Sequence, residues 1–180
     1  MARSDQSQMA ILGALSITPL TGYALREEIR DSLGHFWSES FGQIYPALAE
    51  LERTGLVERT EGTDSRSTPY GITAAGRARL RELLAEPPQQ TRPRNGLLLR
   101  LFFGGELAPE LRVHMVTEAR EEAQARLAQL AIARRDVEGD PRLEHSARFI
   151  LLTISAGEHS ARATIDWADE ALAELASLGD

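Results

Sequence analysis

The sequence predicts a mainly α-helical chain with one small β-hairpin, divided into two halves of similar length. Apolar residues recur with the helical period through most of the chain, and a strand-like pattern appears only between residues 56 and 72. A polar segment with three prolines, Glu86 to Pro93, breaks these patterns near the middle, because proline lacks the N–H that a helix or an inner strand needs. We therefore expect a domain over residues 1–86, a linker over 87–93 and a second domain over 94–180.

Three short helices are expected at the start of the first half. The first is strongly apolar around Ile11 to Leu15 and ends at Thr18-Pro19, because the residue before a proline avoids helical dihedral angles. Thr21 is placed to cap the second helix and Ser40 to cap the third, which Gly55 ends. The inward face of the third helix follows helical spacing and consists of Ile44, Leu48 and Leu51.

The segment after the third helix has the pattern of a hairpin. Leu56 to Thr60 and Thr68 to Ile72 read as short strands joined by a polar turn. Thr73 then caps a fourth helix, which runs from Ala74 to about Ala85. Three helices, a hairpin and a helix in this order predict a winged helix-turn-helix.

Two residues fit their expected helices poorly. If Ser40 caps the third helix, Pro46 lies past the first turn and removes a helical hydrogen bond, which would kink the helix. Alternatively the helix begins nearer Gly42, and Pro46 falls in its first turn. Gly76, in the first turn of the fourth helix, costs up to about 1 kcal/mol relative to alanine, which indicates a close approach of backbone there.

The second half is almost entirely helical in pattern. A short apolar segment, Leu97 to Phe103, comes first. Pro109 suits the first turn of a long helix to about Val137, and Asp140-Pro141 opens a last helix that reaches about Ala176.

The last helix carries apolar and small residues at seven-residue intervals in two adjacent rows, the spacing of a coiled-coil seam. Small residues at mid-length would let another helix approach closely. We interpret the rows as a two-fold dimer seam, because two long helices and one short helix have no other obvious core to share. The alternative is packing within one subunit. The expected dimer interface consists of Ile150, Ile154, Gly157, Ala161, Thr164 and Ala168.

Composition and charge limit the classes of function. The 180 residues are 42% apolar and 26% charged, without cysteine, which is typical of a globular protein without disulfides or thiolate metal sites. No stretch is long and apolar enough to span a bilayer, and residues 1–8 lack the core of a signal peptide. We therefore expect a cytoplasmic protein with no membrane partner. The net charge of −7 lowers long-range attraction to nucleic acid but leaves local contacts open.

Five blocks of the sequence, kept in order, resemble the PadR family of regulators. The most specific runs from Gly42 to Leu48 and continues through Leu51-Glu52 into Gly55-Leu56-Val57. The others are Ile11 to Leu15, Gly22 to Leu25, Tyr70 with Ile72 to Gly76, and Leu99 to Gly104. The resemblance covers roughly residues 9–104. It implies a winged-helix dimer that binds a palindromic operator, usually as a repressor, with the third helix in the major groove and the wing on the backbone or minor groove.

The outward face of the third helix supplies the candidate base contacts. With the apolar residues turned inward, the outward positions are Gln43, Ala47, Glu50 and Arg53, with Tyr45 and Pro46 at the flank. Gln43 can pair with adenine and is expected at a base edge, and Tyr45 and Arg53 at bases or backbone. Ser40, at the helix start, would bring N–H groups near a phosphate. The alternative is a solvated face without a partner.

The wing and the second helix supply the candidate backbone contacts. Arg66 and Ser67, at the wing tip, are expected at a phosphate or in the minor groove, with Arg59 on the strand before them. Residues 62–67 carry one basic residue, fewer than many family members, which argues against strong wing binding. Tyr23 would reach a phosphate with its hydroxyl, or else pack in the core.

Four aromatic residues of the second half are the candidates for an effector site: Trp167, Phe102, Phe103 and Phe149. In the family that the sequence resembles, some members bind planar aromatic effectors beside a tryptophan of the final helix. Trp167 occupies a comparable place, and stacking on such a ligand is physically reasonable. The alternative is that these residues pack in the core.

The sequence offers little for catalysis. It has no lysine, no Gly-x-Ser-x-Gly motif and no phosphate-binding loop. His114 and Glu118 share a helix face, but no third metal ligand is evident. We therefore expect no enzyme, no cofactor and no metal site, and a homodimer whose partners are operator DNA and a small effector. The alternative is a winged helix that binds a protein instead of DNA, which the acidic balance favours.

Overall fold

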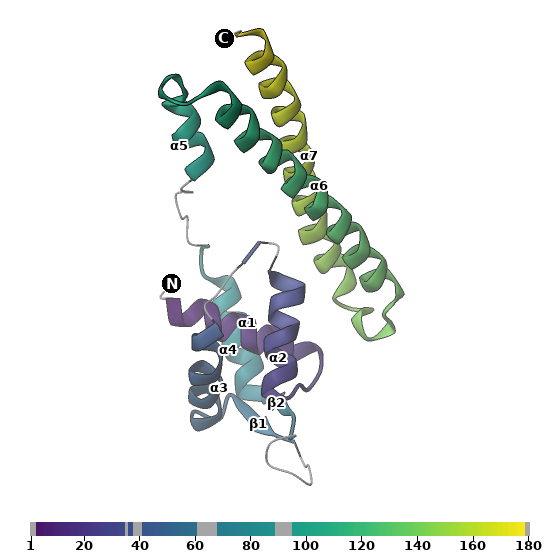
Figure 1. Ribbon diagram of the computed structural model, residues 1–180. Helices are drawn as coiled ribbons and strands as arrows, with labels where there is room; N and C mark the ends of the chain where they lie inside the picture. Colours follow the sequence, from purple (N-terminus) through teal and green to yellow (C-terminus); the bar gives the residue numbers. More distant parts are fainter. Residues whose placement is uncertain (1–2, 35, 38–40, 61–67, 89–94, 179–180) are drawn as a thin grey trace. The chain divides into compact units, whose positions relative to one another are not determined.

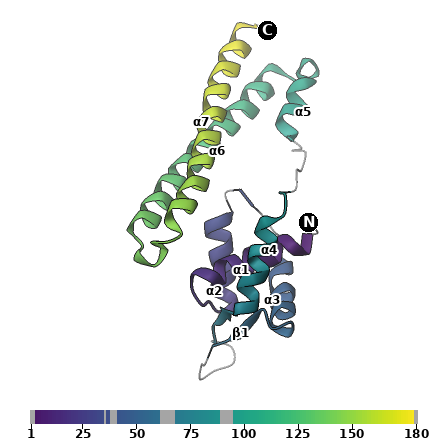
Figure 2. The same cartoon turned by 180° about the vertical axis from the view of Figure 1, so that it is seen from behind.

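The computed structural model describes residues 3–34, 36–37, 41–60, 68–88 and 95–178. The chain folds as two compact units, Met1–Gln90 and Thr91–Asp180 (Figures 1 and 2). Within the described ranges, strands occur only in the first unit, and all other regular structure is helical. The expected class, mainly α with one small hairpin, is confirmed. No helix of the described residues has the length and apolar character needed to span a membrane.

The described part of the first unit has the element order of a winged helix-turn-helix. In chain order its elements are α1 (Arg3–Ile17), α2 (Gly22–Glu28), α3 (Ile44–Arg53), β1 (Val57–Arg59), β2 (Tyr70–Ile72) and α4 (Ala74–Ala85). A π-helical turn, Ile29–Leu33, continues α2, and a 3-10 turn, Phe41–Gln43, precedes α3. The predicted fold of this half is confirmed, although α1 begins several residues earlier than its apolar segment indicates.

Local hydrogen bonds set the helix ends where the sequence predicts them. The Thr21 hydroxyl accepts from the Ala24 amide at 3.2 Å, and the Thr73 hydroxyl accepts from the Gly76 amide at 3.0 Å. At the C-terminal end of α3, Gly55 has a φ of 70°. This is a left-handed conformation that glycine adopts without strain and that commonly ends helices.

The β-hairpin is antiparallel and is anchored to the helices. Val57 pairs with Ile72 and Arg59 with Tyr70. Leu20, between α1 and α2, extends the hairpin, because its amide donates to the Tyr70 carbonyl at 3.1 Å and its carbonyl accepts from the Tyr70 amide at 2.8 Å. The hairpin is therefore fixed through β2 to the segment between α1 and α2.

The core of the first unit decides how α3 is oriented. Ile44, Leu48 and Leu51 are buried, as predicted, so the opposite side of α3 faces outward. Pro46 is the third residue of α3, a position whose N–H would have no partner within the helix. Helix α3 therefore begins at the later of the two expected positions, and Pro46 does not require a kink in the helix.

Gly76 lies where two backbone segments meet. A Cβ atom built on Gly76 would be 2.0 Å from the Leu56 carbonyl oxygen. The same oxygen accepts from the Thr73 amide at 3.1 Å and from the Thr73 hydroxyl at 3.1 Å. The start of α4 thus packs directly on the root of β1, which explains a glycine inside this helix.

The second unit is built on a helical hairpin. Its α-helices are α5 (Gly96–Phe102), α6 (Pro109–Gly139) and α7 (Ala147–Ser177). Helices α6 and α7 run side by side along their length in both views (Figures 1 and 2). The expectation that the last helix opens at Asp140-Pro141 is wrong, because the Asp140 carboxylate accepts from the Arg142 amide at 2.9 Å. A 3-10 turn, Pro141–Leu143, follows there, and α7 begins only at Ala147.

Both long helices bury residues at seven-residue spacing. Those of α6 are Val116, Ala123 and Leu130, and those of α7 are Ile154, Ala161 and Ala168. The α7 row is half of the predicted dimer interface, and its side chains are covered within one subunit. These three residues therefore pack within one subunit, as the alternative interpretation of the rows expects. Ile150, Gly157 and Thr164 are half-buried.

Candidate nucleic-acid interface

The outward side of α3 carries a stripe of polar groups around one small residue. Gln43 and Glu50 are exposed, and Ala47 between them is half-buried against the core. Positions seven residues apart lie on the same side of a helix. Gln43 directly precedes α3 and makes no capping hydrogen bond with its side chain. The side-chain amide of Gln43 is therefore exposed and is not used to cap α3.

Two tyrosines flank this stripe. Tyr45 lies in the first turn of α3, and a Cβ atom on Gly22 would be 3.2 Å from its ring, so the beginning of α2 and the first turn of α3 pack closely there. Tyr45 is 47% exposed and Tyr23 is 65% exposed. The alternative that Tyr23 packs in the core is wrong, and both tyrosines are accessible for contact.

Arg53 is paired within α3. Its Nε donates to Oε2 of Glu50 at 2.8 Å and its Nη2 donates to Oε1 at 2.6 Å. These hydrogen bonds lower the pKa of Glu50 and raise that of Arg53. Arg53 is thus one half of an exposed ion pair with Glu50, which the prediction from outward positions alone did not include. The spacing of three residues on a helix was the available signal.

Arg59 joins α3 to both strands of the hairpin. Its Nε donates to Oε1 of Glu52 at 2.9 Å, and its Nη2 donates to the Tyr70 hydroxyl at 2.7 Å. The guanidinium also lies 4.9 Å from the centroid of the Tyr70 ring. The pKa of Arg59 is raised, chiefly by the hydrogen bond to Glu52, and burial raises the pKa of Tyr70. The antiparallel register puts Tyr70 opposite Arg59, whereas nothing local in the sequence indicates Glu52.

Three predicted contact residues, Ser40, Arg66 and Ser67, lie outside the described residues. Their roles at the start of the third helix and at the wing tip stay predictions. The described residues of the predicted interface are all exposed: Tyr23 on α2, Gln43 just before α3, Tyr45 and Arg53 on α3, and Arg59 on β1.

The candidate effector residues do not form one site within a subunit. Phe149 and Trp167 are 18 positions apart on α7, which is about 27 Å along a helix. Phe102 is 82% exposed, and Phe103 and Phe149 are also exposed, whereas Trp167 is half-buried. Phe102 and Phe103 make an edge-to-face contact at 5.0 Å. The three phenylalanines are therefore not core residues of one chain, contrary to the alternative.

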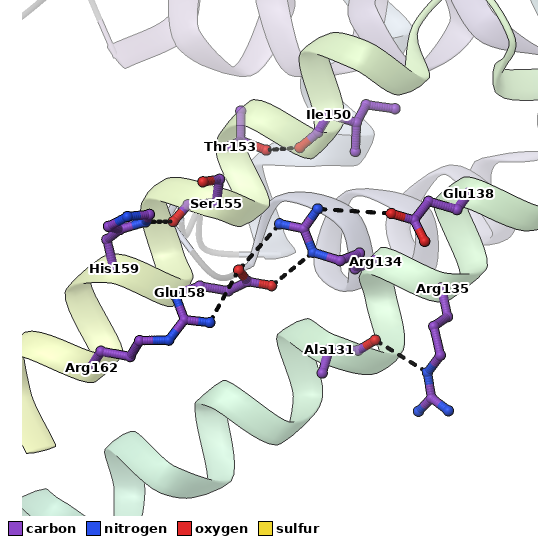
Figure 3. A network of polar contacts seen from close by, with 10 residues as sticks. All are labelled: Ala131, Arg134, Arg135, Glu138, Ile150, Thr153, Ser155, Glu158, His159 and Arg162. Atoms are coloured by element: carbon purple, nitrogen blue, oxygen red, sulfur yellow. Dashed lines mark hydrogen bonds and ion pairs between the residues drawn. The ribbon is translucent and has the colours of Figure 1, made fainter.

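A buried carboxylate connects α6 and α7 (Figure 3). Glu158, on α7, is 8% exposed, and its two oxygens accept from Nε and Nη2 of Arg134, on α6, at 2.9 and 3.2 Å. Arg162 contributes a third contact, 3.5 Å from Nη2 to Oε2 of Glu158, and Glu138 lies 3.8 Å from Arg134. The hydrogen bonds from Arg134 are the main reason that the pKa of Glu158 is lowered.

The fold and the exposed face of α3 define the class of a winged helix-turn-helix regulator, and comparison with known proteins places the chain within that class. Residues 11–82 match the model of the transcriptional regulator PadR-like family, and residues 93–176 match the model of the virulence activator alpha C-terminal domain. A probable transcriptional regulator of Mycobacterium tuberculosis, Rv1176c, is 30% identical over 89% of this chain and 93% of its own. The chain belongs to the PadR-like family of transcriptional regulators.

Two further relatives extend the similarity to solved structures. The negative transcriptional regulator PadR of Bacillus subtilis is 30% identical over 67% of this chain and 69% of its own. Its structure in complex with operator DNA has a TM-score of 0.75, with coverage of 93% of this chain and 98% of that one at 24% identity. The virulence activator AphA of Vibrio cholerae has a TM-score of 0.74 at 28% identity, covering 96% and 99%. PadR of Bacillus subtilis has also been solved with p-coumaric acid.

Proposed function

We propose that the protein is a homodimeric transcriptional repressor that binds a palindromic operator, with α3 of each subunit in the major groove. The observation that carries the proposal is the outward side of α3, where Gln43 and the Glu50–Arg53 pair are exposed while the opposite side forms the core. A helix held by one face with polar groups on the other is what groove recognition requires. The relative from Bacillus subtilis, a negative regulator solved with operator DNA, supports it.

The proposed contacts divide into base and backbone contacts. Gln43 reads a base edge, because its amide can donate and accept toward adenine. The Tyr23 and Tyr45 hydroxyls donate to phosphates on either side, and Arg59 contacts the backbone from the root of the hairpin. Further contacts are assigned to Ser40, Arg66 and Ser67.

The proposed dimer uses the second unit. Exposed apolar side chains occur on α5, at Phe102, and separately at the start of α7, at Phe149 and Leu152, and exposed apolar surface of this kind marks interaction sites. The half-buried residues of the predicted seam, Ile150, Gly157 and Thr164, lie on the same helix. Two subunits would present their α3 helices to half-sites about one helical turn apart, roughly 34 Å.

A small aromatic or apolar effector is proposed to release the operator. Trp167, together with the exposed pair Phe102 and Phe103, supplies ring surfaces in the unit assigned to dimerisation. A ligand there would change the angle between the subunits and misplace one α3 helix. The structure of the Bacillus subtilis relative with p-coumaric acid supports an effector of this chemistry.

We expect Gln43→Ala to weaken operator binding about tenfold, because one bidentate contact to a base is lost. The probe is the DNA flanking the protein's own coding region, searched for an inverted repeat, and affinity is measured by fluorescence anisotropy. Affinity for random duplex should stay unchanged. Gln124→Ala, which removes an exposed glutamine of α6, is the matched control, and equal operator affinity of both variants would contradict the assignment of Gln43.

A second function, binding of a partner protein by the winged helix, is favoured by the acidic charge of the first half and by the carboxylate pairing of Arg53 and Arg59. A salt titration of binding to random duplex separates the two functions. Affinity that falls steeply with salt indicates neutralised phosphates and supports DNA binding. Absence of duplex binding at low salt would support the protein-binding alternative.

We expect Leu152→Glu to shift the protein from dimer to monomer in sedimentation velocity, because it places a charge on the exposed apolar face of α7. Gln124→Glu, an exposed position on α6, adds the same charge as a control and should leave the dimer intact. A Leu152→Glu protein that stays dimeric would place the interface elsewhere.

A further inference from the structure

We propose that Glu50 determines operator specificity by accepting a hydrogen bond from the amino group of cytosine in the major groove, with Arg53 positioning its carboxylate. The inference rests on the proposed function and adds a base identity to it. It follows from the position of Glu50 on α3, from its pairing with Arg53 and from the chemistry of base edges.

The position of Glu50 is suited to base readout. It lies seven residues after Gln43 on the outward side of α3, and its side chain is 48% exposed. Seven residues span about 10 Å along a helix, which corresponds to about three base-pair steps of 3.4 Å. Gln43 and Glu50 can therefore reach two base pairs of the same half-site, with the small residue Ala47 leaving room for the bases between them.

Arg53 fixes the carboxylate without using all its acceptor capacity. Each oxygen of Glu50 accepts one hydrogen bond from the guanidinium, at 2.6 and 2.8 Å, and each has a second lone-pair site. Arg53 also offsets the repulsion between this carboxylate and the phosphates. The pair thus enters the groove with little net charge and with a defined direction for the remaining acceptors.

The chemistry of base edges selects the partner. A carboxylate is only an acceptor, so guanine N7 and O6 and thymine O4, which are acceptors themselves, repel it. The amino group of cytosine is the donor that carboxylates pair with in the major groove, and adenine, which presents N7 beside its amino group, suits an amide better. Glu50 therefore penalises most sequences and favours one, which is how a repulsive group creates specificity.

The test uses the full-length protein and the operator identified with the wild type, together with duplexes that carry each of the four base pairs at every half-site position. For the wild type we expect one position at which C·G is preferred about tenfold or more. In Glu50→Ala the four base pairs at that position should bind within about twofold, while preferences elsewhere, including the one read by Gln43, persist. Arg53→Met should reduce the preference at the same position.

Glu50→Gln gives a result that distinguishes base recognition from a purely structural role of Glu50. An amide pairs with adenine, so the preference at that position should change from C·G to A·T. Glu58→Ala, which removes an exposed carboxylate from β1, controls for charge: it should raise affinity for random duplex and leave the base preference unchanged. A wild type without any sequence preference would overturn the proposed function itself. A preference for C·G that survives in Glu50→Ala would overturn only this inference.

Discussion

Replacing Gly76 with alanine is expected to lower the free energy of unfolding of the first unit by about 2 kcal/mol. Two effects oppose each other. Alanine stabilises a helix relative to glycine by about 1 kcal/mol. Overpacking a close contact costs about 1–3 kcal/mol, and here the new Cβ would be 2.0 Å from the Leu56 carbonyl oxygen. Because that oxygen also accepts from Thr73, moving it away loses about 1 kcal/mol more. The clash therefore prevails.

Gly13→Ala is the matched control for this prediction. Gly13 is also in a helix of the first unit, and a Cβ atom on it would have no atom within 4 Å. The same substitution should therefore raise stability by up to about 1 kcal/mol. Urea unfolding is followed by the fluorescence of Trp37, which packs on the core of the first unit, in a Trp167→Phe background. Similar midpoints for the two variants would show that Gly76 is not held by packing.

The helix ends of the first unit could be predicted because their signals are local. Thr21 and Thr73 each accept a hydrogen bond from an amide three residues later, which requires no knowledge of the rest of the fold. The start of α7 was mispredicted for a similarly local reason. The Asp140 side chain and the proline after it close a 3-10 turn, and the spacing of later apolar residues does not reveal it.

What a helix packs against cannot be predicted from its own sequence. The seven-residue row of α7 was interpreted as a dimer seam, yet α6 carries a buried row of the same spacing that includes Ala123. For Ile154, Ala161 and Ala168, comparison of the two rows favours packing within the subunit, and the dimer seam stays a prediction. In the first unit the inward side of α3 was predicted correctly, and its outward side consists of the remaining positions. The pairing of Glu52 with Arg59 depends on how the hairpin folds back on α3, so no local pattern indicates it.

We expect Arg134→Met to lower the melting temperature of the second unit by about 5 °C or more at pH 7, because it leaves the Glu158 carboxylate buried with only the more distant Arg162. The wild-type pair should also give a characteristic pH dependence. The folded-state pKa of Glu158 lies below its ordinary value of 4.5. The ionised carboxylate therefore contributes stability above that value, and this stability is lost as the pH falls through the folded-state pKa.

In Arg134→Met this acid-dependent loss should become smaller, because the main cause of the lowered pKa is gone. Melting curves recorded by circular dichroism between pH 7 and pH 3 measure both effects. Arg120→Met is the matched control on α6, since its partner Asp169 is 52% exposed and an exposed ion pair contributes little to stability. If the two methionine variants melt alike across this range, the contact between Arg134 and Glu158 does not hold α6 to α7. The stability of the helical hairpin then rests on the buried seven-residue rows alone.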